Sequence, residues 1–128
     1  MGASQSDRQL TARESALLET LFAVPFQGRD ELRQQLQAAT VIPSRYPESN
    51  TLLFQVNRAL APHAAVTWRV PIEAEGNDAD GMPFAILLHV LDGYLSELEI
   101  YRMDGKPFLD YPQPSNLRIE PPVVEHDS

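Results

Sequence analysis

Two glutamates and a histidine in the second half of the chain are the residues best placed for acid–base chemistry. Glu97 and Glu99 are two positions apart, so a β-strand would place both carboxylates on one face. Paired carboxylates can bind a metal, and they can catalyse acid–base reactions when a cleft gives them different pKa values. The sequence indicates no such cleft, and a solvated strand face is the favoured interpretation. His89 lies within an apolar run, which favours a hydrogen-bonded core or interface histidine over a general base.

Other familiar catalytic and metal-binding patterns fail in this sequence. The segment 77–81 (Asn-Asp-Ala-Asp-Gly) is similar to the middle of a calcium loop, but Gly76 and Leu87 would occupy the first and last ligand positions, and neither has a side-chain oxygen. The absence of cysteine excludes thiolate zinc sites and cysteine nucleophiles. No serine lies in a nucleophile elbow, and the glycines form no phosphate-binding loop. We therefore expect no enzymatic activity, no cofactor and no bound metal.

The net charge of -8 is distributed unevenly along the 128 residues. Residues 1–70 contain six acidic residues and seven arginines, whereas residues 71–128 contain twelve acidic and three basic residues. This charge argues against binding to nucleic acid or to anionic membranes. An acidic surface would attract a basic protein partner. The alternative is a solvated surface whose charge keeps the protein in solution.

Length and composition predict a single cytoplasmic domain. No run of 18 apolar residues is present, and the polar segment 1–9 does not have the pattern of a secretory signal, so we expect no membrane span and no export. The lack of cysteine fits a reducing compartment. We expect a disordered lead-in over residues 1–9, one α+β domain over residues 10–119, and a loose tail over residues 120–128.

The first third of the chain predicts two helices. Thr11 and Glu14 have the spacing of a capping box, and leucines follow at helical intervals until Pro25 and Gly28 end the pattern. A second helix is predicted from about Arg29 to Ala39, with Leu32 and Leu36 on its apolar side and Gln35 on its polar side.

Alternation and turn signals predict antiparallel strands in the rest of the chain. The expected strands cover residues 40–42, 51–56, 64–72, 84–91 and 94–101, and residues 117–119 are a candidate for a short edge strand. The fold class is therefore α+β, with two N-terminal helices packed on an antiparallel meander sheet of about five strands. The residues expected in the core are Leu17, Leu21, Leu36, Trp68, Leu87 and Leu98.

The turn at Asp92-Gly93 predicts a two-residue β-hairpin, whose register decides which side chains share a face. Without a bulge, Leu87 opposes Leu98, and that face would receive the helices. A bulge would shift the register by one residue. In the unbulged register the opposite face bears an apolar strip beside carboxylates and a tyrosine, a mixture typical of partner-binding surfaces. Coverage by a loop or by the C-terminal segment is the alternative. The residues of this second face are Phe84, Ile86, Leu88, Val90, Leu95, Glu97, Glu99 and Tyr101.

The hairpin also carries a resemblance. The segment from Asp92 to Pro107, together with Leu10-Thr11 at the start of a helix, resembles a family of small uncharacterised bacterial domains with a two-helix start and a DG-x-L-x-ELE hairpin. The resemblance extends from about Leu10 to Leu117. The family has no defined catalytic residues, so the resemblance implies none here. Small acidic bacterial domains of this general kind are similar to immunity proteins, which neutralise a toxin delivered by a neighbouring cell.

From charge, size and this analogy we expect a cytoplasmic immunity-type protein that occludes a basic toxin of a contact-dependent growth inhibition system or a related polymorphic toxin system. The residues expected to contact the toxin are Glu97, Glu99 and Tyr101 on the hairpin, with Asp78, Asp80, Asp92 and Asp104 in the flanking turns. Two alternatives stay open. One is a small ligand-binding or enzymatic domain with a site near His89, Glu97 and Glu99, and the other is a regulatory interaction domain without a toxin.

Overall fold

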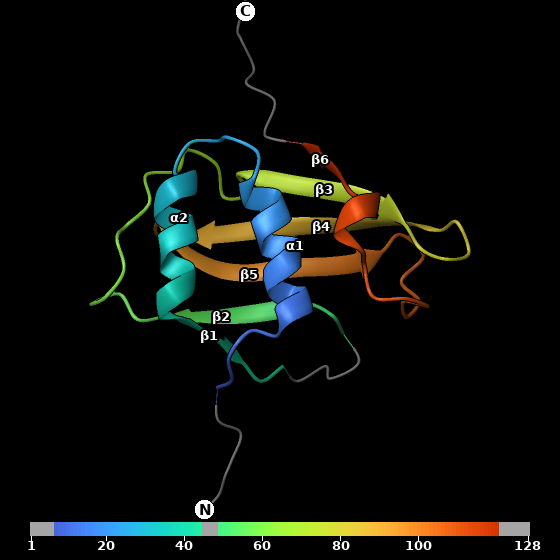
Figure 1. The fold of residues 1–128 in the computed structure, drawn as a ribbon, viewed down its shortest axis with the longest axis horizontal. Coiled ribbons are helices and arrows are strands. Elements are labelled where there is room, and N and C mark those ends of the chain that lie inside the picture. The colour runs from blue at the N-terminus through green and yellow to red at the C-terminus, as the bar shows by residue number, and fades with distance from the viewer. Residues whose placement is uncertain (1–6, 45–48, 121–128) are drawn as a thin grey trace, which may run out of the picture.

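Two helices lie across one face of a six-stranded antiparallel sheet (Figure 1). The structure is a computed structural model, and it describes residues 7–44 and 49–120. The strand order is β1-β2-β5-β4-β3-β6, so β2 lies beside β5 and the sheet is not a simple meander. The α+β class is confirmed, with six strands rather than about five. The strands are β1 (Ala39–Ile42), β2 (Leu52–Val56), β3 (Ile72–Asn77), β4 (Pro83–Leu91), β5 (Tyr94–Arg102) and β6 (Arg118–Glu120).

Helix α1 (Ala12–Phe22) begins with the predicted capping box. The Thr11 hydroxyl accepts a hydrogen bond from the Glu14 backbone N–H at 3.2 Å, and the Glu14 carboxylate accepts one from the Thr11 N–H at 2.9 Å. Arg8 binds the same carboxylate through both terminal nitrogens, at 2.9 and 2.8 Å. The backbone of Arg8 also exchanges two hydrogen bonds with Val41, so this part of the predicted lead-in is attached to the sheet edge. Residues 1–6 and 121–128 lie outside the described residues.

Helix α2 (Arg29–Gln35) is shorter than predicted and continues as a 3₁₀ turn (Leu36–Ala38). The prediction that Gln35 faces solvent is wrong, because its exposed fraction is 0%. Its amide nitrogen donates to the carbonyl oxygens of Pro62 and Gly93, both at 2.8 Å, and its amide oxygen accepts from the Leu95 N–H at 2.9 Å. Buried polar groups are normally hydrogen-bonded, and these bonds attach α2 to the turn of the hairpin and to the loop at Pro62. Neither this helix nor α1, the two described α-helices, is long and apolar enough to cross a bilayer.

The hairpin turn is confirmed, and the strands beyond it contain a bulge. Asp92 and Gly93 both have positive φ, at 54° and 82°, as a type I′ turn requires, and Leu91 opposes Tyr94 as predicted. Val90 then pairs with Leu95 but His89 pairs with Glu97, which leaves one extra residue in β5. The predicted pairing of Leu87 with Leu98 is therefore wrong, and Leu88 opposes Leu98 instead.

This shift exchanges the two faces of β4. Phe84, Ile86, Leu88 and Val90 point toward the helices and are buried, whereas the prediction placed them on the opposite face. We call the face turned away from the helices the outer face. In the hairpin, it bears Ala85, Leu87 and His89 from β4 and Glu97, Glu99 and Tyr101 from β5.

The predicted core is only partly confirmed. Leu17, Leu21 and Leu98 are fully buried, whereas Leu36 and Leu87 are partly buried. Trp68 is 44% exposed, because residues 64–71 form a loop rather than the predicted strand. The strand in this region is β3, whose buried positions include Ile72 and Ala74. The apolar residues Val66, Trp68 and Val70 alternate as in a strand, but this segment has no neighbouring strand that would bury one of its faces.

Adjacent leucines on opposite faces of β4 allow the register to be tested. Leu88→Ala should lower the free energy of unfolding by about 2–5 kcal/mol, because it opens a cavity in the core. Leu87→Ala should cost clearly less, because that side chain is half-buried on the outer face and removes less apolar area from water. Urea unfolding of both variants measures the difference, and an equal or reversed cost would contradict the bulged register.

Candidate functional site

The structure divides the seven residues predicted to contact a partner among three places. Three aspartates converge on a buried arginine, three residues share the outer face of β5, and one aspartate lies in the hairpin turn at the other end of that strand. In that order the groups are Asp78, Asp80 and Asp104; Glu97, Glu99 and Tyr101; and Asp92.

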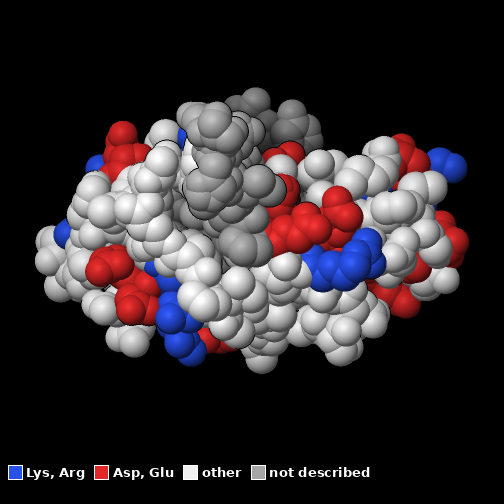
Figure 2. Space-filling view, turned by 90° about the horizontal axis from the view of Figure 1, so that it is seen from above, with Lys and Arg blue, Asp and Glu red and all other residues white. Residues whose placement is uncertain are grey.

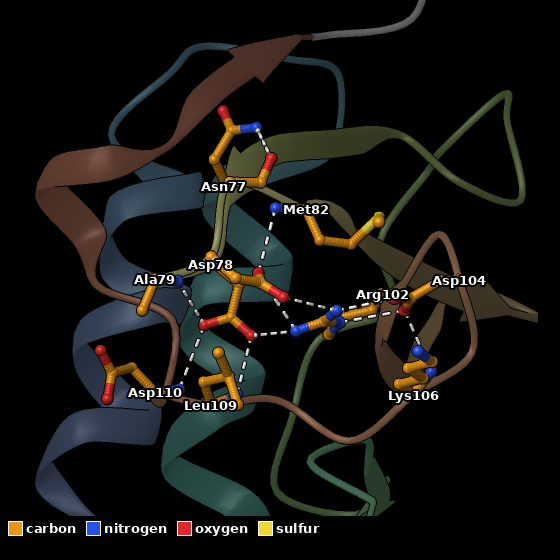
Figure 3. A network of polar contacts seen from close by, with 11 residues as sticks. Asn77, Asp78, Ala79, Met82, Arg102, Asp104, Lys106, Leu109 and Asp110 are labelled. Carbon is orange, nitrogen blue, oxygen red and sulfur yellow. Dashed lines mark hydrogen bonds and ion pairs between the residues drawn. The ribbon is translucent and has the colours of Figure 1, made fainter.

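Arg102 is the centre of the first group (Figure 3). It ends β5 on the helix side of the sheet, and its side chain is only 3% exposed. Asp104 accepts from its Nε at 3.0 Å and from its Nη2 at 2.6 Å, and Asp80 accepts from Nη1 at 3.3 Å and from Nη2 at 3.0 Å. Asp78 accepts from Nη1 at 2.9 Å. Such forked bonds suit the planar guanidinium, and they offset the cost of burying its charge.

Asp78 links this arginine to a separate segment of the chain. Its side chain is 1% exposed, and its carboxylate also accepts backbone N–H bonds from Ala79 at 2.8 Å, Leu109 at 2.7 Å and Asp110 at 3.1 Å. The β3–β4 turn, the end of β5 and the segment after β5 therefore meet at one carboxylate, as Figure 3 shows.

Both Asp78 and Asp104 are strongly acidic in the folded state. Burial disfavours the charged form of Asp78, but the N–H bonds from Leu109, Ala79 and Asp110 and the bond from Arg102 outweigh it and lower the pKa of Asp78 to about 2. The hydrogen bonds from Arg102 lower the pKa of Asp104 to about 2 as well. The same contacts raise the pKa of Arg102, so the cluster stays charged at neutral pH.

The second group lies on the outer face, which is rich in glutamate. Figure 2 views the molecule from above, onto the edge of the sheet at β6 and β3, and shows a group of acidic side chains beside a basic group there. On the outer face of the described strands, five glutamates accompany one arginine, Arg118, which lies 3.6 Å from Glu75. The five are Glu73, Glu75, Glu97, Glu99 and Glu120.

A hollow of about 690 Å³ lies on this face over β2 and β5. Among the described residues, its lining includes Leu53, Thr51, Glu97, Glu99 and Tyr101. Leu53 stands directly opposite Glu97 in the sheet, so apolar and acidic side chains adjoin. A smaller hollow of about 250 Å³ shares Tyr101 and reaches Lys106.

His89 and Glu99 form a close pair beside this hollow. The Nε2 atom of His89 lies 2.8 Å from a carboxylate oxygen of Glu99, and the other ring nitrogen, Nδ1, is buried without a hydrogen-bond partner. The structure thus brings together the three residues of the alternative site, His89, Glu97 and Glu99. Nowhere in residues 7–44 and 49–120 do three or more histidine and acidic side chains form a group that could hold a metal ion.

In a comparison with protein-family models, residues 7–112 match a domain of unknown function (DUF6984). The chain belongs to the DUF6984 family. This agrees with the resemblance to an uncharacterised family, and it leaves the immunity analogy as an expectation. No curated protein and no solved structure matches the chain. The DUF6984 match includes Arg102, its three aspartates and the hollow of the outer face.

Sequence reasoning missed Arg102 as the centre of this DUF6984 domain. The signal was present, because Arg102 continues the spacing of Leu98 and Ile100 and so belongs to the buried face. A buried arginine requires carboxylate partners, and aspartates in the two adjacent turns are the nearest candidates. The unbulged register assigned the wrong β4 partner to every residue of β5 beyond Leu95.

Acid should weaken this DUF6984 protein through Asp78 and Asp104. Their pKa values of about 2 in the folded state lie below the value of about 3.9 in an unfolded chain, so their stabilising contribution is complete above that value and is lost as the pH falls through about 2. Asp78→Asn should be less stable at pH 7 and should lose less stability on acidification. Urea unfolding between pH 7 and pH 2 measures both effects.

The matched control is Asp92→Asn, which alters an exposed turn aspartate. It should follow the wild-type curve. An Asp78→Asn variant with the wild-type dependence on pH would contradict the role assigned to this carboxylate.

Proposed function

We propose that this protein is a binding module that holds a basic protein on the outer face of its sheet, and that the partner is a cognate bacterial toxin neutralised by occlusion in the cytoplasm. The observation that carries the proposal is the composition of the outer face, which neither helix covers and where, among the described strand residues, five glutamates accompany one arginine. Occlusion requires a stable complementary surface and no reaction chemistry.

The arrangement of the outer face fits a protein partner. Tyr101, 38% exposed, and the half-buried Leu53 and Leu87 supply apolar contact area between the carboxylates. Interfaces typically combine an aromatic centre with a polar rim, and complementary charge accelerates encounter and selects partners. A toxin whose substrate groove is basic, such as a nuclease, would be chemically complementary to this face.

The proposed contact surface is narrower than the set expected from the sequence. Glu97, Glu99 and Tyr101 form its centre. Asp78 is buried, and Asp80 and Asp104 are bonded to Arg102, so we assign these aspartates to the stability of the fold instead. Asp92 lies in the exposed hairpin turn, at the rim.

Reversing the charge of the outer face should abolish protection. If a toxin gene lies beside the gene for this protein, co-expression of that toxin with the wild-type protein should restore growth. The double variant Glu97→Lys, Glu99→Lys should fail to protect, because it places like charges against the toxin. Colony counts after toxin induction measure this, with circular dichroism to verify that the variant folds.

The control makes the same change of charge on the helix side. Glu19→Lys, Asp30→Lys alters two exposed helix residues whose ion pairs with Arg33 and Arg29 contribute little to stability. This variant should protect fully. Full protection by the Glu97, Glu99 variant would remove this face from the proposal, and failure of the wild type to protect would remove the immunity function for that toxin.

Association with a basic partner should depend on salt. The association rate constant should fall by about tenfold or more when ionic strength rises from roughly 0.02 M to 0.3 M, because screening removes long-range attraction while the contacts made after docking persist. Stopped-flow fluorescence measures the rate. A constant rate over this range would contradict electrostatic steering by the acidic face.

A second candidate function is favoured by the pair of His89 and Glu99. A histidine 2.8 Å from a carboxylate at the edge of a hollow is an arrangement that general acid–base catalysis uses. Under this alternative the protein binds or converts a small ligand, and His89→Gln would abolish its function in the native host. An occluding protein would keep its protective effect in that variant. A regulatory interaction domain without a toxin would show no protection against any neighbouring toxin gene.

A further inference from the structure

One carboxylate in the hollow of the outer face is left without a partner. Glu97 is half-buried, yet its side chain makes no hydrogen bond or ion pair with any residue that the structure describes. Glu99 is held by His89 at 2.8 Å, and the Thr51 hydroxyl both accepts from the Ile100 N–H and donates to the Ile100 carbonyl. A partly desolvated carboxylate gains free energy when a cation reaches it. Glu97 is therefore the group of this hollow with most to gain from a ligand.

The surroundings of Glu97 specify the shape of that cation. None of the described residues that line the hollow is basic. Glu97 and Glu99 are two positions apart on one face of β5, a spacing of about 6–7 Å along a strand. A guanidinium presents N–H groups along two edges and can meet both carboxylates, whereas an ammonium is a compact charge that meets one of them.

The apolar part of the hollow fits the rest of an arginine side chain. Leu53 stands opposite Glu97, and Tyr101 lies two positions beyond Glu99 on the same face. The methylene groups of arginine pack against aliphatic side chains, and its planar head packs against aromatic rings. This protein already contains the same recognition in its interior, where Arg102 is held between the paired carboxylates of Asp80 and Asp104.

We propose that the hollow on the outer face receives one arginine side chain of the partner, with its guanidinium between Glu97 and Glu99 and its stem beside Leu53 and Tyr101. The proposal rests on the proposed function, since it takes the partner to be a basic protein, and it names the group by which that protein is recognised. Arginine anchors of this kind commonly dominate the binding energy of an interface.

The test uses blocked tripeptides and does not require the partner. Acetyl-Gly-Arg-Gly-amide is titrated into the ¹⁵N-labelled full chain, beside the analogues that carry citrulline or lysine at the central position. The arginine peptide should bind with a Kd of roughly 1–10 mM and shift the amide signals of Leu53, Glu97 and Tyr101. Citrulline has the same shape without the charge, and its peptide should bind at least about tenfold more weakly. The lysine peptide should fall between the two.

Matched variants locate the site. Glu97→Gln should weaken the arginine peptide by about tenfold, because it removes the free charge and keeps the shape of the side chain. Glu120→Gln removes the same charge from the outer face, away from the described lining of the hollow, and should change the Kd by less than about twofold. Equal binding of the arginine and citrulline peptides would overturn the proposal. So would an unchanged Kd in Glu97→Gln, or shifts confined to other strands.

The outcome is separable from that of the proposed function. Binding of the arginine peptide at Glu97 without protection against the neighbouring toxin would support the arginine site and overturn the immunity function. Protection through the outer face without a saturable shift at arginine-peptide concentrations up to about 20 mM would support the proposed function and overturn the arginine site.

Discussion

The burial of Arg102 is the constraint on which the rest of this structure depends. A guanidinium can lie among core residues only if carboxylates surround it, and here Asp78, Asp80 and Asp104 do so from two turns. Because Asp78 also binds the backbone of residues 109 and 110, one charge cluster fixes the end of β5, the β3–β4 turn and the segment after the hairpin. Three of the four aspartates that the sequence analysis assigned to a partner-binding surface therefore stabilise the fold instead.

The opposite end of β5 is fixed in a different way. Gln35 on α2 bonds to Gly93 and Leu95 around the hairpin turn, directly before the bulge. These contacts hold β5 at both ends, and its alternate residues lie on opposite sides of the sheet. Glu97, Glu99 and Tyr101 are presented outward on a strand held at both ends, which is the rigid support that precise recognition requires.

Local signals in the sequence were sufficient for some elements and not for others. The capping box at Thr11 and the type I′ turn at Asp92-Gly93 depend on a few adjacent residues, so they were predictable. The bulge depends on contacts between distant segments, including the hydrogen bond that the Leu95 N–H donates to Gln35, and the spacing of apolar residues does not reveal such contacts. The same reason explains Trp68, whose alternating neighbours lack a sheet partner. The outward position of Glu97 and Glu99 was predicted, but their neighbours His89 and Leu87 follow only from the bulged register.

The bulge in β5 makes the register of this hairpin as important as its residue types. Side chains along a strand alternate, so it is the bulge at Ser96, a residue without a partner in β4, that brings Arg102 inward and Glu97 outward together. If Ser96 paired with His89 while the turn stayed fixed, the arginine would point toward water and the glutamates into the core. Point substitutions on the outer face do not change which residues of β5 point inward and which point outward. Related chains can therefore diverge in the surface they present while the register between the turn and the buried arginine stays the same.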